Sequence, residues 1–307
     1  MPLERYLADL ADQSKPFKGA GLVLLSALTP AEMEVVRAYW GKIPPERRRQ
    51  VLLHLLEMET NSVELDFTPF LQFCLQDPDE EVRAQAVEGL WESEERPLIT
   101  TLLVLLRSDQ SPRVRSAAAQ ALGRFVHLVQ EGVLPEREGE RIRRALLDAY
   151  HRVDQGIEVK RRALESLAPF CDAKIDALIQ EAYRSREPLL RQGAIYAMGR
   201  TCDARWLPTV LQELDSPDPV MRREAASACG ELGDEAALSP LLARWRTEDD
   251  LQVRLTVISA LGAIGGPVAK KFLQGLLKTP EAPVREAARQ ALENLEFTED
   301  PLSFKYS

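Results

Sequence analysis

Two segments in the C-terminal part of the chain decide the fold. They read Asp218-Pro-Val-Met-Arg222-Arg-Glu-Ala-Ala-Ser-Ala-Cys-Gly230 and Asp250-Leu-Gln-Val-Arg254-Leu-Thr-Val-Ile-Ser-Ala-Leu-Gly262. In both, small and apolar residues recur at spacings of three and four, which is the pattern of one buried helix face. The aspartate that opens each segment is a good N-cap, because its side chain can accept a hydrogen bond from a free backbone N–H. Each segment therefore predicts one amphipathic helix.

The same pattern returns along most of the chain. Its basic position falls at Arg83, Arg115, Lys160, Arg191, Arg222, Arg254 and Arg285, in steps of 32, 45, 31, 31, 32 and 31 residues. A fixed period of this length indicates a repeat architecture. The single step of 45 residues indicates an insertion in one repeat, with a longer loop from Gly132 to Gly139.

Each repeat is interpreted as two antiparallel helices. The second helix begins four residues before the basic position, and a more apolar segment such as Leu207–Leu214 forms the first helix of the next repeat. One helix pair of this size cannot bury its apolar face, so neighbouring pairs must stack. The sequence therefore predicts an all-α fold, an α-solenoid of about eight helix pairs with repeats of about 31 residues.

The repeats resemble short HEAT repeats, similar to the PBS-lyase HEAT-like family, in the pattern Asp-Pro-Asp-x-x-Val-Arg followed by spaced alanines and Leu-Gly. The resemblance covers about residues 66–296. We predict an N-terminal capping unit over 1–65, the array over 66–296 with an insertion near 126–140, and a tail over 297–307. The resemblance implies that the second helices line a concave surface. It says little about function, because such arrays have many unrelated roles.

Charge is distributed unevenly along the chain. The whole chain has 48 acidic and 39 basic residues and a net charge of −9, which disfavours a general nucleic-acid or anionic-membrane partner. Residues 141–205 differ, with 13 bases and 9 acids. The basic residues named for this island are Arg141, Arg143, Arg144, Lys160, Arg161, Arg162, Arg184, Arg186, Arg191, Arg200 and Arg205. They could bind nucleic acid or a phosphate ligand, or they could form ion pairs within the array.

Helical phase selects a candidate binding patch. Residues one, five and nine positions after the basic residue should point away from the buried stripe of the second helix. The predicted partner-binding residues on the concave surface are Arg161, Gln192, Tyr196, Arg200 and Arg223. Tyrosine and arginine are frequent anchors of interfaces. The repeated arginines themselves are interpreted as a structural ladder that binds loop carbonyls or capping carboxylates, and Asp172, Asp203 and Asp234 as helix N-caps.

Motifs for catalysis are absent from the sequence. His54, His127 and His151 have no His or Cys neighbour at ligand spacing, and no phosphate-binding glycine motif or nucleophile elbow occurs. HEAT-like hydroxylases use His-Glu pairs for iron, and no His-Glu dipeptide is present. Four cysteines without a Cys-x-x-Cys spacing are expected to be reduced thiols. We therefore predict no metal and no cofactor.

The leading hypothesis is a non-catalytic scaffold or adaptor that binds a protein or peptide on its concave surface. One alternative is nucleic-acid or phosphate-ligand binding through residues 141–205. Another is a lyase-type enzyme related to the phycobilin lyases, which share this repeat type. The longest apolar run near the N-terminus, Gly19 to Leu28, is too short to span a bilayer. We expect a monomeric cytoplasmic protein without a membrane partner.

Overall fold

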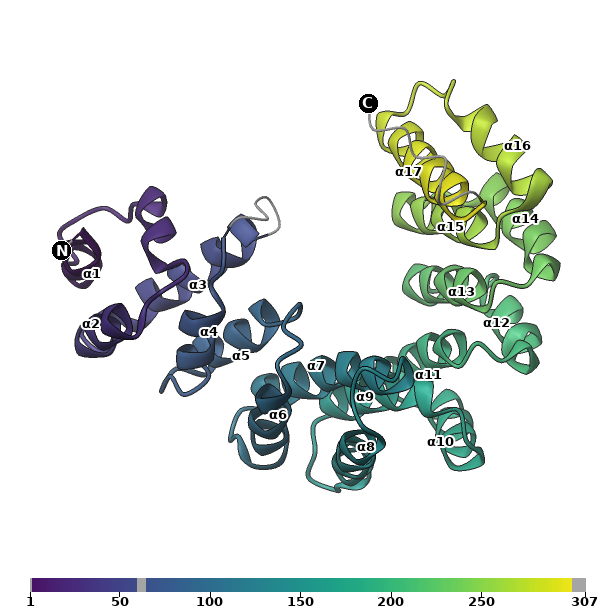
Figure 1. Ribbon diagram of the computed structural model, residues 1–307. Helices are drawn as coiled ribbons and strands as arrows, with labels where there is room; N and C mark the ends of the chain where they lie inside the picture. The colour runs from purple at the N-terminus through teal and green to yellow at the C-terminus, as the bar shows by residue number, and fades with distance from the viewer. Residues whose placement is uncertain (1, 60–64, 300–307) are drawn as a thin grey trace. The chain divides into compact units, whose positions relative to one another are not determined.

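The computed structural model describes residues 2–59 and 65–299, and all regular secondary structure in these ranges is helical (Figure 1). The chain divides into two compact units, Met1–Ala163 and Leu164–Ser307. Each unit is a stack of antiparallel helix pairs, so the predicted all-α solenoid is confirmed. The predicted boundary at residue 65 is not the boundary between these units, and it stays a prediction.

Unit 1 begins with the predicted N-terminal helices. Its helices are α1 (Pro2–Ala11), η1 (Gly19–Leu25), α2 (Pro30–Trp40), α3 (Pro45–Glu59), α4 (Thr68–Cys74), α5 (Glu80–Gly89), α6 (Arg96–Ser108), α7 (Pro112–Gln130), α8 (Glu136–His151) and the start of α9 (Ile157–Leu167). Thr29 and Glu32 form a reciprocal capping box that fixes the start of α2. The second helices α3, α5 and α7 pack on one another in succession.

The insertion in unit 1 is more helical than the sequence predicted. We expected a long loop from Gly132 to Gly139, but α8 already begins at Glu136. Glu138 explains the difference, because its buried carboxylate accepts hydrogen bonds from Arg96 at 2.6 Å and Arg141 at 2.6 Å. These ion pairs fix the first turn of α8 against α6. The loop prediction for residues 136–139 was therefore wrong.

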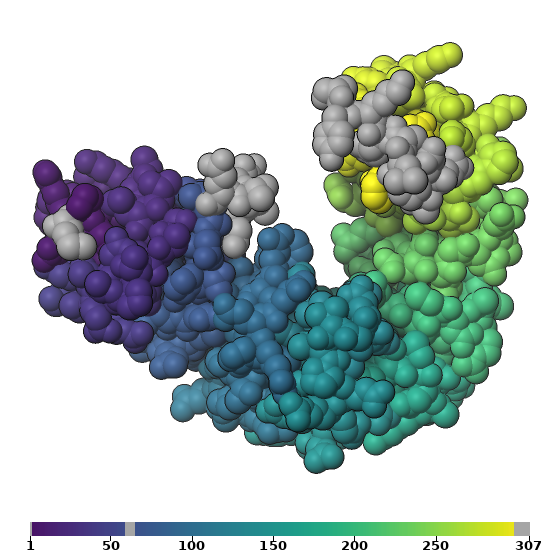
Figure 2. Space-filling model, viewed as in Figure 1, coloured from purple at the N-terminus to yellow at the C-terminus, as the bar shows by residue number. Residues whose placement is uncertain are grey.

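Unit 2 alternates first and second helices without an insertion. It contains the end of α9, η2 (Ala168–Phe170), α10 (Ala173–Tyr183), α11 (Pro188–Arg200), η3 (Ala204–Trp206), α12 (Leu207–Glu213), α13 (Pro219–Leu232), η4 (Glu235–Ala237), α14 (Leu238–Thr247), α15 (Leu251–Ile264), α16 (Gly266–Leu276) and α17 (Ala282–Glu299). Second helices α11, α13, α15 and α17 stack directly on one another (Figure 1). The surface of this unit changes steadily from teal to yellow, as repeats in sequence order should (Figure 2). Most of the predicted tail, residues 300–307, lies outside the described residues.

Three glycines make the second helices of unit 2 approach closely. A Cβ atom on Gly199 would lie 2.8 Å from Cα of Ala228, and one on Gly230 would lie 2.9 Å from Cα of Ala260. Gly262 meets Ala291 in the same way, at 2.8 Å from its Cβ. These contacts were not predicted from the sequence. We call this row of Gly–Ala contacts the glycine seam.

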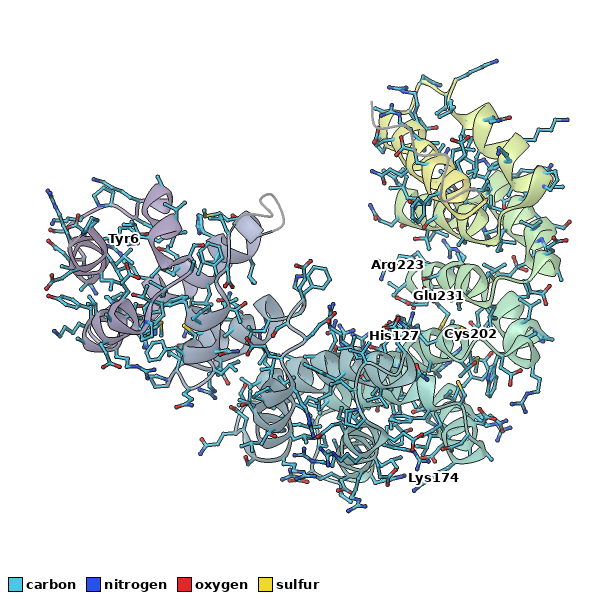
Figure 3. All side chains as sticks on the ribbon, in the orientation of Figure 1. Tyr6, His127, Lys174, Cys202, Arg223 and Glu231 are labelled. Atoms are coloured by element: carbon cyan, nitrogen blue, oxygen red, sulfur yellow. The ribbon has the colours of Figure 1, made fainter. Side chains whose placement is uncertain are left out.

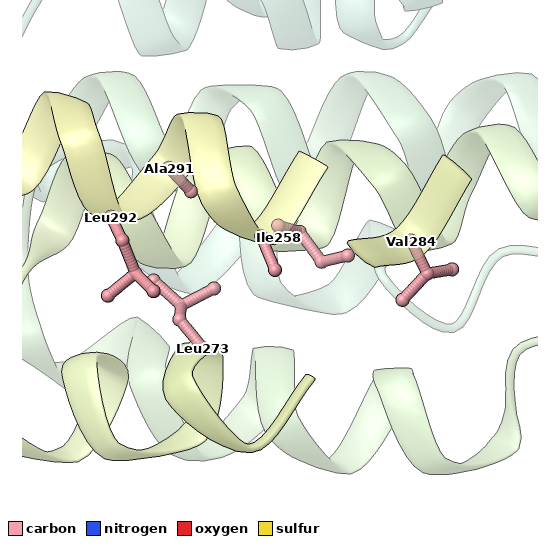
Figure 4. Close-up of a cluster of buried hydrophobic side chains, with 6 residues drawn as sticks. Ile258, Leu273, Val284, Ala291 and Leu292 are labelled. Carbon is pink, nitrogen blue, oxygen red and sulfur yellow. The ribbon is translucent and has the colours of Figure 1, made fainter. Parts of the chain in front are cut away.

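The last repeat shows how each pair buries its apolar stripe. Ile258 of α15, Leu273 of α16 and four residues of α17 form one buried cluster (Figure 4). The members from α17 are Val284, Ala288, Ala291 and Leu292. Ala291 faces Gly262 of the neighbouring second helix, and Leu273 of the first helix joins the same buried cluster. The core of the unit is therefore a repeated layer between first and second helices.

Most of the predicted N-caps are confirmed. The carboxylates of Asp79, Asp218 and Asp250 accept hydrogen bonds from backbone N–H groups at the starts of α5, α13 and α15. Asp172, Asp203 and Asp234 cap α10, η3 and η4 in the same manner. Ser111 and Glu187 occupy the cap position without a side-chain cap bond. Their helices begin with Pro112 and Pro188, which have no N–H to satisfy.

Candidate functional site

The repeated arginines form the predicted structural ladder. Arg83 donates to the carbonyl oxygens of Asp77 and Pro78 at 2.7 and 3.1 Å, and to both carboxylate oxygens of Asp109 at 2.8 Å. Arg222 repeats this arrangement with Ser216, Pro217 and Glu248. Its two bonds to Glu248 measure 2.8 and 2.9 Å. Each arginine thus closes its own interhelical loop and links it to the next repeat, which confirms the structural interpretation at these positions.

Other members of the ladder keep part of this geometry. Arg115 donates to the carbonyls of Asp109 and Gln110 and to the amide oxygen of Gln155 at 2.9 Å. Arg254 pairs with Glu281 at 2.8 Å, and Arg285 bonds two loop carbonyls. Arg191 is held more loosely, at 3.5 Å from Glu213. The guanidinium N–H groups of the ladder are therefore already engaged in hydrogen bonds and are not available to a ligand.

The predicted binding patch falls on both units. Arg161 lies on α9 in unit 1, is 16% exposed, and pairs with Glu158 at 2.6 Å. The other four residues lie in unit 2. Gln192, Tyr196 and Arg200 recur at four-residue spacing on α11, and Arg223 lies on α13.

Within unit 2, Tyr196 is the exposed aromatic residue of the patch, with 38% of its surface accessible. Arg200 pairs with Glu231 of the next repeat at 3.1 Å, and Arg223 lies 3.3 Å from Glu224. Arg223 and Glu231 both lie on α13 (Figure 3). Helical phase placed Tyr196 at an exposed position, while Gln192, Arg200 and Arg223 are only partly exposed and both arginines are already engaged by acids.

The basic island at 141–205 is largely neutralised by neighbouring acids. Eight of its eleven named residues form ion pairs with a carboxylate: Arg141, Arg143, Arg144, Arg161, Arg162, Arg191, Arg200 and Arg205. In the described part of the chain, Lys160, Arg184 and Arg186 have no such pair. A phosphate ligand would have to compete with these internal carboxylates. This pattern favours the ion-pair interpretation over a nucleic-acid site.

A hollow opens on the second-helix face of unit 1. It encloses about 310 Å³ and lies among α5, α7 and α9. The residues that line it are Glu88, Pro112, Arg113, Ser116, Ala117, Gln120, Glu158 and Arg162. Arg113 bonds Glu81 at 2.7 Å and Glu88 only at 3.3 Å, whereas Arg162 bonds Glu158 at 3.1 Å. We call this feature the α5–α7–α9 hollow.

The carboxylates in the hollow differ in their electrostatics. Burial raises the pKa of Glu88 above its usual value, and Glu81 adds to the rise, although Arg113 and Arg162 oppose it. The hydrogen bond from Arg161 instead lowers the pKa of Glu158. Glu88 is therefore the carboxylate whose charge is compensated least.

Trp91 is an exposed aromatic residue that the sequence analysis left out of the patch. It is 54% exposed in the turn after α5, and the guanidinium carbon of Arg124 lies 6.0 Å from its ring centroid. Arg124 also bonds Glu94 at 2.9 Å. Gln120 precedes Arg124 by one helical turn on α7, so Arg124, together with the ring of Trp91 that it approaches, lies next to the hollow. The sequence signal for Trp91 is its position eight residues after Arg83, where several other repeats have glycine.

Cys171 and Cys202 occupy equivalent left-handed positions, with φ of 48° and 53°. The thiol of Cys171 contacts the carbonyl oxygen of Thr201 at 3.3 Å, and burial raises its pKa. Both thiols are free, as expected. Among residues 2–59 and 65–299, no three His, Cys, Asp or Glu side chains gather as metal ligands, and no helix is long and apolar enough to cross a membrane.

Comparison with known proteins agrees with the repeat pattern. The chain matches the family of HEAT repeats over residues 67–136 and 207–293, which together are just over half of its length. No curated protein matches it in sequence.

Solved structures with similar folds are distant in sequence. Human deoxyhypusine hydroxylase in complex with glycerol is 18% identical, with a TM-score of 0.37 over 96% of this chain and 97% of that chain. The complex of CpcE and CpcF of phycocyanin lyase from Nostoc is 19% identical, with a TM-score of 0.48 over 76% and 96%. Kap95p bound to RanGDP is 15% identical, with a TM-score of 0.46 over 98% and 46%.

Proposed function

We propose, from the premise that this chain belongs to the HEAT-repeat family, that it is a non-catalytic scaffold whose second-helix face binds a protein or peptide partner. The observation that carries the proposal is the stacking of second helices in register. Within each unit, stacking places the outward positions of successive second helices in rows, so each unit has a surface that exists before any partner arrives. A preformed surface lowers the ordering cost of binding.

The composition of this surface also supports a protein partner. The outward rows of unit 2 combine an exposed aromatic residue, Tyr196, with amide, hydroxyl and paired charged groups such as Gln192, Ser227 and the Arg200–Glu231 pair. Interfaces commonly combine an aromatic anchor with polar groups at the rim. A nucleic-acid site would instead need basic side chains that are free to contact phosphates, and most of the arginines here form ion pairs with carboxylates.

Photo-crosslinking tests the proposal directly. Tyr196 is replaced by p-benzoylphenylalanine in the full chain, which is irradiated in extract of its native cell, and crosslinked products are identified by mass spectrometry. The expected result is one dominant protein partner. The matched control carries the same group at Gln212, an exposed position on α12. Equal crosslinking from both positions, or none from Tyr196, contradicts the proposal for this face.

A double substitution measures the energy of the contact. Tyr196→Ala with Arg200→Ala should weaken the captured partner by at least about tenfold, since aromatic and arginine anchors often contribute more than about 1 kcal/mol each. Thermal unfolding should change little because Tyr196 is exposed and the Arg200–Glu231 pair lies at the surface. Unchanged affinity in this variant would place the binding site elsewhere.

A further inference from the structure

The α5–α7–α9 hollow has the size and shape to accept one long side chain of a partner. It encloses about 310 Å³ and opens on the second-helix face of unit 1, where α5, α7 and α9 present polar groups together. Pro112 and Ala117 provide apolar wall, and Ser116 and Gln120 provide hydrogen-bonding groups. The mixed lining suits an extended aliphatic stem that ends in a polar head.

The charges in the hollow select the sign of that head. Both arginines already have carboxylate partners at shorter distances than Arg113 has to Glu88. An incoming carboxylate would compete with Glu81 and Glu158 for these arginines. An incoming cation would meet Glu88, the most weakly paired carboxylate in the lining.

The segment that supplies α5 and α7 favours the same sign. Residues 77–140 carry 13 acids and 7 bases, a net charge of −6, whereas α9 belongs to the basic segment 141–205. Trp91 continues the surface beside the hollow and is 54% exposed, so an indole face can contact a cationic or aliphatic group. Charge and aromatic exposure thus occur on the same part of unit 1.

We propose that the α5–α7–α9 hollow binds a basic side chain, arginine or lysine, of the peptide partner, with Glu88 as the counter-ion and Trp91 as the adjacent contact. The inference rests on the proposed function, because it names the chemistry of the segment bound by the second-helix face. It concerns unit 1 alone and makes no use of the Tyr196 patch. The raised pKa of Glu88 supports it, since a nearby cation would stabilise the charged carboxylate.

Titration with two matched peptides tests the inference. The probes are acetyl-Ala-Ala-Arg-Ala-Ala-amide and the same peptide with citrulline, which keeps the shape of arginine without its charge. Binding to the full chain is followed by the ¹⁵N-indole signal of Trp91, assigned with Trp91→Phe. The arginine peptide should shift this signal and bind about fivefold more tightly than the citrulline peptide, the factor expected for one partly exposed ion pair.

Variants then assign the preference to the hollow. Glu88→Gln should remove the difference between the two peptides, while the exposed control Glu34→Gln on α2 should retain it. Circular dichroism of each variant confirms that it is folded. Equal affinity for the two peptides in the native chain, or an unchanged preference in Glu88→Gln, overturns the inference.

The two proposals can fail separately. Crosslinking from Tyr196 combined with equal peptide affinities would leave the scaffold function intact and remove only the basic-side-chain assignment. The reverse outcome would move partner binding to unit 1.

Discussion

The second helix α5 of unit 1 and the second helices α11, α13 and α15 of unit 2 follow one sequence pattern but differ eight residues after the basic position, whereas α7 of unit 1 has Gly123 there. In unit 2 this position is Gly199, Gly230 or Gly262, and each lies against an alanine of the next helix. After Arg83 in unit 1 it is Trp91, which lies outside α5 and remains 54% exposed. Glycine lets the helices meet closely, whereas tryptophan cannot enter such a contact. This position thus distinguishes α5, which is followed by an exposed aromatic residue, from the helices of the glycine seam.

The largest effect should come from the ladder, which both units share. Arg222→Ala removes the bidentate partner of the Glu248 carboxylate, whose side chain is 1% exposed, and leaves it paired with Arg244 at 3.1 Å. It also removes the hydrogen bonds to two loop carbonyls. We expect a loss of about 3 kcal/mol in the free energy of unfolding, measured by urea denaturation. Arg83→Ala should cost a similar amount in unit 1.

A surface ion pair provides the control for the ladder. Arg289→Ala removes the exposed partner of Glu286 and should leave the denaturation midpoint nearly unchanged. A large loss for Arg222→Ala with none for Arg83→Ala would show that the ladder is not a shared element. The two units would then differ in the stability contribution of the ladder as well as in the packing of their second helices.

The next effect concerns the glycine seam. Gly230→Val places a branched side chain where even a Cβ atom would lie 2.9 Å from Cα of Ala260. We expect a destabilisation of about 2 kcal/mol from overpacking. Gly275→Ala is the control in α16, where nothing lies within 4 Å. That substitution should stabilise the chain by about 0.5 kcal/mol through helix propensity. If both variants change stability in the same direction, close packing at Gly230 is not what distinguishes unit 2.

A smaller effect is expected from acid. The hydrogen bond from Arg222 holds the pKa of Glu248 below its usual value in the folded chain, and Arg96 does the same for Glu138 in unit 1. A lowered folded-state pKa stabilises fully above the unfolded-state pKa and is lost as pH falls through the folded-state value. The stability difference between the native chain and Glu248→Gln should therefore narrow between about pH 6 and pH 3. Parallel stability curves over that range would contradict this linkage.

Sequence reasoning succeeded where one physical rule recurs in every repeat. The period of the basic residues, the aspartate caps and the apolar stripe each appear several times, so stacking of helix pairs could be predicted from them. The glycine seam was missed because glycine near a helix end normally indicates termination. Gly230 and Gly262 instead lie within their helices, two residues before the last helical residue. Their role in close helix packing becomes visible only when the neighbouring helix is placed beside them.

The candidate sites were less predictable because they depend on pairs from different repeats. Helical phase placed Tyr196 at the surface, but the ion pair between Arg200 and Glu231 joins residues 31 positions apart. The hollow needs Glu88, Arg113 and Glu158 from three helices, and no linear motif contains them. The step of 45 residues predicted an insertion between α7 and α9, but the residues that line the hollow could be identified only from the structure.

The smallest stability effect should come from filling the hollow, and it tests the comparison most finely. Ser116→Leu adds a larger side chain to the lining of the α5–α7–α9 hollow, where about 310 Å³ is open. We expect the free energy of unfolding to stay within about 0.5 kcal/mol of the native value, because the added volume meets space and leucine favours a helix. The same change should block the arginine peptide, since its side chain would need that space. Normal stability with unchanged peptide binding would show that the cation binds outside the hollow. A loss as large as that of Gly230→Val would instead show that unit 1 is packed as closely as unit 2 and that no open surface distinguishes them.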